Sequence, residues 1–205
     1  MSRVITILGM GMTALRKADA IEAFVEGSEV WSLNNAYLMF PSLRGKFARY
    51  FEIHGWQYLQ SWNPGTHEGQ RVDHFAMLDQ QGCPVYCAGR LPLVENQVIY
   101  PFKEVLEHFG PSAEFKGSPS WMIALALYEH DKGQKVDELR SYGIDQLDAA
   151  HVSQRAAWAQ WIVRAEQRGI RIGGTAANFR NEPETDAGLV GLVEYYRNEL
   201  SSKGK

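Results

Sequence analysis

Two pairs of an acid and a histidine stand where the chain could use them for proton transfer. Glu52 and His54 are two residues apart in "RYFEIH", so on a strand they share a face and the carboxylate can orient the imidazole. Asp145 and His151 lie close together in "YGIDQLDAAH", after another strand-like run. Because histidine exchanges protons near neutral pH, His54, Asp145 and His151 are the candidate catalytic residues. An internal polar pair, or a solvated histidine at a helix start, is the alternative.

A short glycine turn follows the first apolar run of the chain. "VITIL" at 4–8 leads into "GMGMT", in which Gly9 and Gly11 precede Thr13, a candidate helix cap. Such a turn can offer backbone N–H groups and a helix N-terminus to a phosphate, although a plain strand–helix turn is the alternative. The third glycine of the dinucleotide fingerprint is missing, and Asn34-Asn35 stands where an NAD site has an acid. Both departures argue against NAD, while asparagine can still bind a ribose or base.

Apolar runs of strand length alternate with helical patterns. Strands are predicted over 4–8, 29–33, 49–54, 84–87, 138–145 and 170–174, the 138–145 run passing into a loop. Helices are predicted over 13–25, 67–81, 100–110, 118–130, 149–169 and 187–200, with Ser118 as a cap and Pro119 as the first residue of its helix. Strands joined through helices form parallel units, so we predict an α/β, three-layer, Rossmann-like fold with a mostly parallel sheet and helices on both faces. Ligands bind such sheets beyond the carboxyl ends of the strands.

Composition narrows the class of protein. The 205 residues suffice for one domain with a sizeable core, and we expect a nucleotide-binding domain over 1–180 followed by a C-terminal helix and solvated tail over 181–205. The net charge of −3 argues against a broad nucleic-acid surface. The sequence has no membrane-length apolar run and no signal peptide, and Cys83 and Cys87 fit no redox or zinc spacing. These features predict a cytoplasmic protein with reduced thiols and no metal.

Five segments occur here in the same order as in a group of phage- and prophage-encoded proteins of uncertain function. They are the G-x-G-x-[ST] turn, "WSLNNAY", "YFEIH", "SPSWMIALAL" and "SYGID". The chain resembles these proteins over the region 4–180. They look like small relatives of the bacterial Rossmann-type sialyltransferases that use CMP-sialic acid, and the layout is also similar to a pterin-diphosphokinase-like family.

The resemblance implies a nucleotide site and a general base. Positions matching the family's nucleotide-binding motifs are Gly9, Gly11, Thr13, Asn34, Asn35, Ser118, Ser120, Tyr142, Gly143 and Ile144, with Asp145 in the same closing segment. The family's proposed base begins the next long helix, where His151 stands; His54 takes that role if His151 points away. Only residues 146–150 separate Asp145 from His151, so the longer acceptor lid of the sialyltransferases is missing or replaced, and the glycine turn lacks their proline. Sialic acid specificity is therefore not implied.

The leading expectation is a nucleotide-binding transferase, glycosyltransferase-like, that takes a nucleotide or nucleotide-sugar as a substrate and holds no tightly bound cofactor. A non-catalytic phage accessory protein that binds a nucleotide or a host protein is one alternative. A transferase that modifies phage DNA is another, which the acidic balance disfavours. The expected partner is a small-molecule nucleotide rather than nucleic acid or a membrane, in the host cytoplasm if the chain is phage-encoded. A homo-oligomer is left open.

Overall fold

The computed structural model describes residues 2–11, 27–67, 69–144, 154–174 and 198. Within them, seven strands form one sheet in the order β7-β6-β3-β2-β1-β8-β9, and every neighbouring pair is parallel. The strands are β1 (Val4–Leu8), β2 (Glu29–Leu33), β3 (Arg49–Glu52), β6 (Val85–Cys87), β7 (Gln97–Ile99), β8 (Glu138–Tyr142) and β9 (Arg171–Gly174). The predicted α/β class with a parallel sheet is confirmed.

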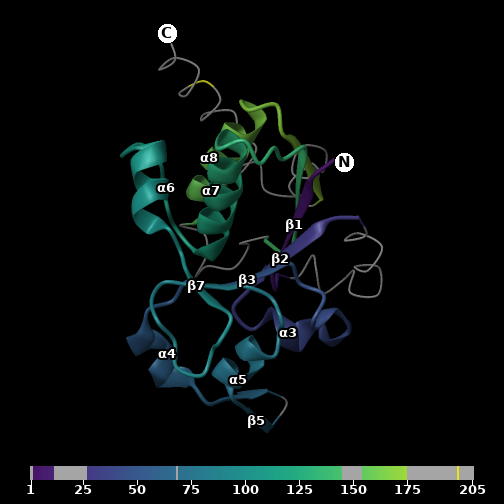
Figure 1. The fold of residues 1–205 in the computed structure, drawn as a ribbon, viewed down its shortest axis with the longest axis vertical. Helices are drawn as coiled ribbons and strands as arrows, with labels where there is room; N and C mark the ends of the chain where they lie inside the picture. Colours follow the sequence, from purple (N-terminus) through teal and green to yellow (C-terminus); the bar gives the residue numbers. More distant parts are fainter. Residues whose placement is uncertain (1, 12–26, 68, 145–153, 175–197, 199–205) are drawn as a thin grey trace.

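Helices cover both faces of the sheet (Figure 1). On one side lie α6 (Phe102–Phe109), α7 (Ser118–Asp131) and α8 (Arg155–Glu166). On the other lie α3 (Ala36–Met39), the 3-10 turn η2 (Pro41–Leu43), α4 (Trp56–Trp62) and α5 (His74–Asp79). An antiparallel hairpin of β4 (Gly65–His67) and β5 (Gln70–Val72) precedes α5. The three-layer arrangement is therefore confirmed as well.

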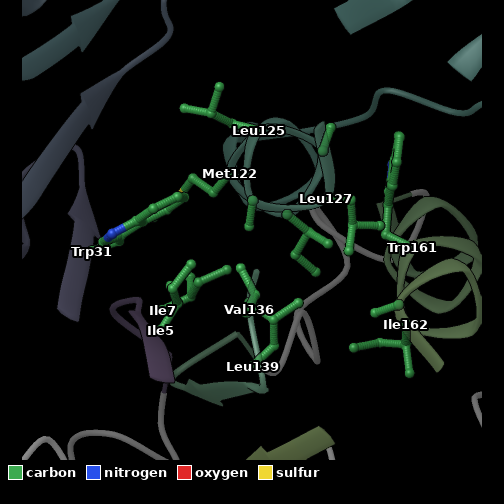
Figure 2. Packing of buried hydrophobic residues seen from close by; sticks show 14 of the residues in the cluster. Ile5, Ile7, Trp31, Met122, Leu125, Leu127, Val136, Leu139, Trp161 and Ile162 are labelled. Carbon is green, nitrogen blue, oxygen red and sulfur yellow. The ribbon is translucent and has the colours of Figure 1, made fainter. Parts of the chain in front are cut away.

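Alternate residues of each strand supply the two cores, since successive strand side chains point to opposite faces. Ile5, Ile7 and Trp31 pack against α7 and α8, and Figure 2 shows Trp31 beside Met122 of α7. Trp161 of α8 is fully buried in this core. Leu8, Val30 and Tyr50 face the other way, toward α3 and α5. Because both faces of the sheet are buried, packing on each side fixes the positions of the carboxyl ends of the strands.

Several elements differ from their predicted bounds. β3 ends at Glu52, so His54 follows the strand instead of belonging to it. The helix predicted over 67–81 begins only at His74, because the hairpin takes up the preceding residues and Asp73 caps the helix by accepting the N–H groups of Phe75 and Ala76. The strand β7 was not predicted, because its three residues are too few to show a strand periodicity. The predicted helix at 13–25, the start of that at 149–169, and the one at 187–200 apart from Asn198 lie outside the described residues.

A group of ion pairs lies at the amino ends of the strands, at the edge of the sheet opposite the strands' carboxyl ends. Arg3 precedes β1 and pairs with Glu29 at 2.8 Å and with Glu129 of α7 at 2.9 Å. Arg49 starts β3, also pairs with Glu129, and lies 4.5 Å from the centroid of the Trp31 ring. These contacts join the sheet to the end of α7, so they serve the fold. In the described part of the chain no helix is long and apolar enough to cross a membrane.

Candidate functional site

A pocket of about 260 Å³ lies at the carboxyl edge of the sheet, lined by the segments that follow β1, β2, β3 and β8 and by the start of α7. The chain runs from β1 outward through β2, β3, β6 and β7 and then returns to the other side of β1 at β8. The pocket therefore sits at the topological switch point, where open parallel sheets bind ligands.

Most described members of the predicted site meet at this pocket. Gly9, Gly11, Asn34, His54, Ser118, Gly143 and Ile144 line it. Sequence reasoning did not single out the other described lining residues, which are Met10, Leu33, Gly117, Pro119 and Gln154. Most of them are apolar or small, so their residue types do not suggest binding or catalysis. Only their position next to predicted site residues in the sequence could have indicated them.

The remaining predicted site residues are placed elsewhere or are not described. Asn35 caps α3 without a side-chain bond, and Tyr142 is buried in the core on the α3 side. Ser120 is fully buried, and its hydroxyl donates to the Lys116 carbonyl at 2.8 Å. None of these three lines the pocket as the described residues define it. Thr13, Asp145 and His151 lie outside the described residues, so their roles stay predictions.

The two glycines of the first turn do not offer their N–H groups to a ligand. The Gly9 N–H donates to the Tyr142 carbonyl and the Gly11 N–H donates to the Gly143 carbonyl, both at 2.8 Å. These bonds extend the β1–β8 pairing beyond the last residues of the strands. The expectation that these two N–H groups bind a phosphate is therefore wrong, because both already donate to carbonyls of the adjacent segment. The glycines instead let the two chain segments approach closely.

We predict that Gly9→Ala lowers the free energy of unfolding by about 1–3 kcal/mol. A Cβ on Gly9 would lie 2.4 Å from the Gly143 carbonyl oxygen and 2.4 Å from the Ile144 side chain, and backbone cannot move aside cheaply. Gly89→Ala is the matched control, since a Cβ there meets nothing within 4 Å. Urea denaturation of both variants measures the difference. Equal stability of the two would contradict the close approach of β1 and β8.

Asn34 is a polar residue of the pocket whose side chain has an unsatisfied hydrogen-bond acceptor. Its backbone is left-handed, with φ of 53°, a conformation that costs a side-chain-bearing residue energy. Its N–H donates to the Phe51 carbonyl at 3.0 Å, which holds the turn in place. Its buried Oδ1 has no hydrogen-bond partner among the described residues. A buried acceptor left this way suits a donor from a ligand, such as a ribose hydroxyl or a base amino group.

The start of α7 forms a second wall of the pocket. Gly117 rather than Ser118 is the N-cap, with φ of 76° and no side-chain cap bond, so the predicted cap was one residue late. A Cβ on Gly117 would lie 2.1 Å from Oε1 of Gln154, so glycine is what lets α7 and Gln154 meet here. In the first turn of this 14-residue helix, Pro119 has no N–H and the Ser120 N–H donates to the Gly117 carbonyl at 3.2 Å, so the Ser118 N–H is the donor left for a ligand. The positive end of the helix dipole also borders the pocket. This end is the better candidate for an anionic group.

His54 lines the pocket, and its imidazole is held between a carboxylate and an aromatic ring. Its Nδ1 lies 2.6 Å from Oε1 of Glu52, and its backbone N–H donates to the same oxygen at 3.2 Å. The ring of Tyr58 stacks on it with centroids 4.6 Å apart. Because an ionised carboxylate only accepts, Nδ1 is the donor in this contact, and in a neutral imidazole the lone pair is then on Nε2, which has no partner within the described chain. The side chain is 34% exposed, so His54 suits the role of a general base.

Glu52 is a fully buried carboxylate held between two histidines. Its Oε2 lies 2.7 Å from Nε2 of His74, whose Nδ1 lies 2.8 Å from the hydroxyl of Tyr37. Burial by itself raises the pKa of Glu52, but the hydrogen bonds from His54 and His74 outweigh it and lower that pKa below its ordinary value. Glu52 is thus ionised at neutral pH. Sequence reasoning paired it with His54 and missed His74 and Tyr37, which come from α5 and α3.

The lowered pKa of Glu52 predicts a loss of stability in acid. A carboxyl whose pKa falls on folding adds stability above its unfolded pKa, near 4.5, and that stability is lost as the pH falls through the folded value. We expect the free energy of unfolding to fall below about pH 4.5, by up to about 1.4 kcal/mol per pH unit for each proton taken up. In Glu52→Gln this fall becomes shallower. Urea denaturation between about pH 7 and pH 3 tests it, and an unchanged slope would contradict it.

The thiols and metal ligands add no second chemistry in the described part of the chain. Cys83 and Cys87 are unpaired and buried, and burial raises their pKa values to about 11 and about 12. Neither is a thiolate near neutral pH, so neither suits nucleophilic attack. No group of three His, Cys, Asp or Glu side chains among the described residues is arranged to hold a metal ion.

Comparison of the chain with protein-family models, with curated proteins and with solved structures finds no match.

Proposed function

We propose that the chain is a nucleotide-binding, Rossmann-like transferase whose donor substrate is a nucleotide-sugar. The observation that carries the proposal is the Glu52–His54 pair at the rim of a pocket built at the switch point of the parallel sheet. The unmet Oδ1 of Asn34 supports recognition of a ribose or base, and the start of α7 supports a phosphate. The motif order shared with the sialyltransferase-like phage proteins supports a sugar as the transferred group. The unpaired thiols of Cys83 and Cys87 are in keeping with a cytoplasmic location.

In the proposed reaction, Nε2 of His54 takes the proton of an acceptor hydroxyl as its oxygen attacks the anomeric carbon of the donor. The bond from that carbon to the phosphate oxygen breaks, and the nucleotide leaves with the electron pair. The Ser118 N–H and the positive end of the α7 dipole stabilise the charge on the leaving phosphate. The Glu52 carboxylate stabilises the imidazolium formed at His54. His151 and Asp145 stay candidates for the same proton transfer.

A thermal-shift screen with CMP, UDP, GDP and ADP and their sugar conjugates tests the binding part of the proposal. A nucleotide present at 100 times its Kd adds about 2.7 kcal/mol to stability. Asn34→Gly removes the amide while keeping a residue that tolerates the left-handed backbone, so we expect at least a tenfold weaker affinity in a folded protein. Asn96→Gly, at an exposed asparagine outside the pocket, is the matched control.

The outcomes separate the alternatives. No shift with any nucleotide would overturn the proposal. A shift that Asn34→Gly abolishes, combined with no detectable release of nucleotide from any bound nucleotide-sugar, would favour a binding protein without chemistry. Salt-sensitive retention of DNA in place of a nucleotide shift would favour the DNA-modifying alternative.

A further inference from the structure

The hydrogen bonds that orient His54 continue inward through three elements. Glu52 on β3 bonds His74 on α5 at 2.7 Å, and His74 bonds the hydroxyl of Tyr37 on α3 at 2.8 Å. Glu52, His74 and Tyr37 are all fully buried, while His54 is the partly exposed end of the chain of bonds. Hydrogen bonds in a buried network polarise one another, so the network can hold its terminal residue, here His54, more strongly than a single pair would.

The donors and acceptors in this chain fit one arrangement with both histidines neutral. An ionised carboxylate only accepts, so each imidazole must donate to Glu52, through Nδ1–H of His54 and Nε2–H of His74. The Nδ1 of His74 then carries a lone pair and accepts the hydroxyl proton of Tyr37. Burial and the charge of Glu52 raise the pKa of Tyr37 far above its ordinary value, so Tyr37 remains a donor.

We propose that His74 and Tyr37 are positioning residues that act on His54 through Glu52. Tyr37 fixes the tautomer of His74, and His74 supplies a permanent donor to the inner oxygen of the carboxylate. The carboxylate is thereby kept ionised and oriented, so that its outer oxygen holds Nδ1–H of His54 and leaves the Nε2 lone pair toward the pocket. The proposal rests on the proposed role of His54 as the base.

In the described part of the chain, no lysine or arginine pairs with Glu52 to keep its carboxylate ionised. The partners that lower the pKa of Glu52 are the two histidines. The described titratable or charged groups that also act on the cluster include Tyr50 on β3, Cys87 on β6, Tyr58 against His54, and Arg44 and Asp73, whose charges act on Tyr37. Loss of the His74 bond should therefore let the effect of burial dominate at Glu52.

NMR titration of the ligand-free protein, with ¹³C at the glutamate carboxyls and ¹⁵N in the imidazoles, tests the proposal. In His74→Phe we expect the Glu52 midpoint to rise by about one unit or more and the His54 nitrogens to leave the single Nδ1–H form. His74→Gln, whose amide can donate to Glu52, should return both signals toward wild type. His130→Phe, at a buried histidine outside the cluster, should change neither. Wild-type signals for Glu52 and His54 in His74→Phe would overturn the proposal.

A second variant keeps the test decisive if His74→Phe does not fold. Tyr37→Phe keeps the ring and removes only the hydroxyl, and we expect a smaller shift at both groups and a mixture of tautomers at His74. Unchanged His74 and Glu52 signals in that variant would equally overturn the proposal. The NMR measurement needs no nucleotide, so the two proposals fail separately. A failed nucleotide screen with the expected NMR changes refutes the proposed function alone. Nucleotide binding without those NMR changes refutes the positioning role of His74 and Tyr37 alone.

Discussion

His54→Gln is expected to slow transfer by about 10²–10⁴-fold, the range typical of a lost general base. Glutamine retains a polar side chain of similar reach, but its amide cannot take up a proton near neutral pH. The affinity for the nucleotide should stay within about twofold, since the contacts argued for the nucleotide come from Asn34 and the start of α7. The rate is measured as release of nucleotide from the nucleotide-sugar that gives the largest thermal shift.

His108→Gln is the matched control for this variant. His108 also pairs with an acid, at 2.7 Å from Asp131, but it lies on α6 and does not line the pocket. We expect the control to retain the wild-type rate. Equal rates for His54→Gln and His108→Gln would remove His54 from the mechanism and leave His151 as the candidate base.

Glu52→Ala is expected to lower the free energy of unfolding by roughly 2–4 kcal/mol. The substitution leaves the Nε2–H of His74 buried without its acceptor, and it opens a cavity beneath the sheet edge. His54 is partly exposed, so water can replace its lost bond, and most of the cost falls on the inner histidine. Urea denaturation at neutral pH gives the value.

Glu107→Ala provides the comparison for an exposed glutamate. Its 4.0 Å pair with Lys103 joins side chains that are 67% and 81% exposed, and such pairs contribute little. A loss in Glu52→Ala no larger than in Glu107→Ala would mean that the histidines find other partners. The cluster would then not be the anchor of this edge of the sheet.

Element type was predictable wherever the hydrophobic pattern was long or regular. β1 and β2 have the predicted bounds, and α7 differs by one residue. Short runs rich in apolar residues favour buried parallel strands, and a longer apolar run favours a buried helix. The segment predicted as a helix over 67–81 was misjudged, since a hairpin turn at Gly69, with φ of 78°, left too few residues to show a strand period.

The location of the pocket was predictable for a topological reason. Parallel strands end at one edge, so Gly9, Asn34, His54 and Gly143 had to gather there once the order of strands and helices was known. The chemistry assigned to them was only partly predictable. The N–H groups of Gly9 and Gly11 look available in sequence, yet they donate to the carbonyls of Tyr142, the last residue of β8, and of Gly143 just after it, more than a hundred residues away in the chain.

By itself, the sequence determined the α/β class, the edge that carries the pocket, and the pairing of Glu52 with His54, because each follows from short-range periodicity and the rules of parallel sheets. Only the tertiary structure decided which donors are free for a ligand and which are used by a neighbouring strand. It also decided that His74 and Tyr37 lie behind the carboxylate, since α3, β3 and α5 must pack together before those side chains can meet. Hydrogen bonds between distant segments leave no periodic trace in the chain, so no local pattern could have revealed them.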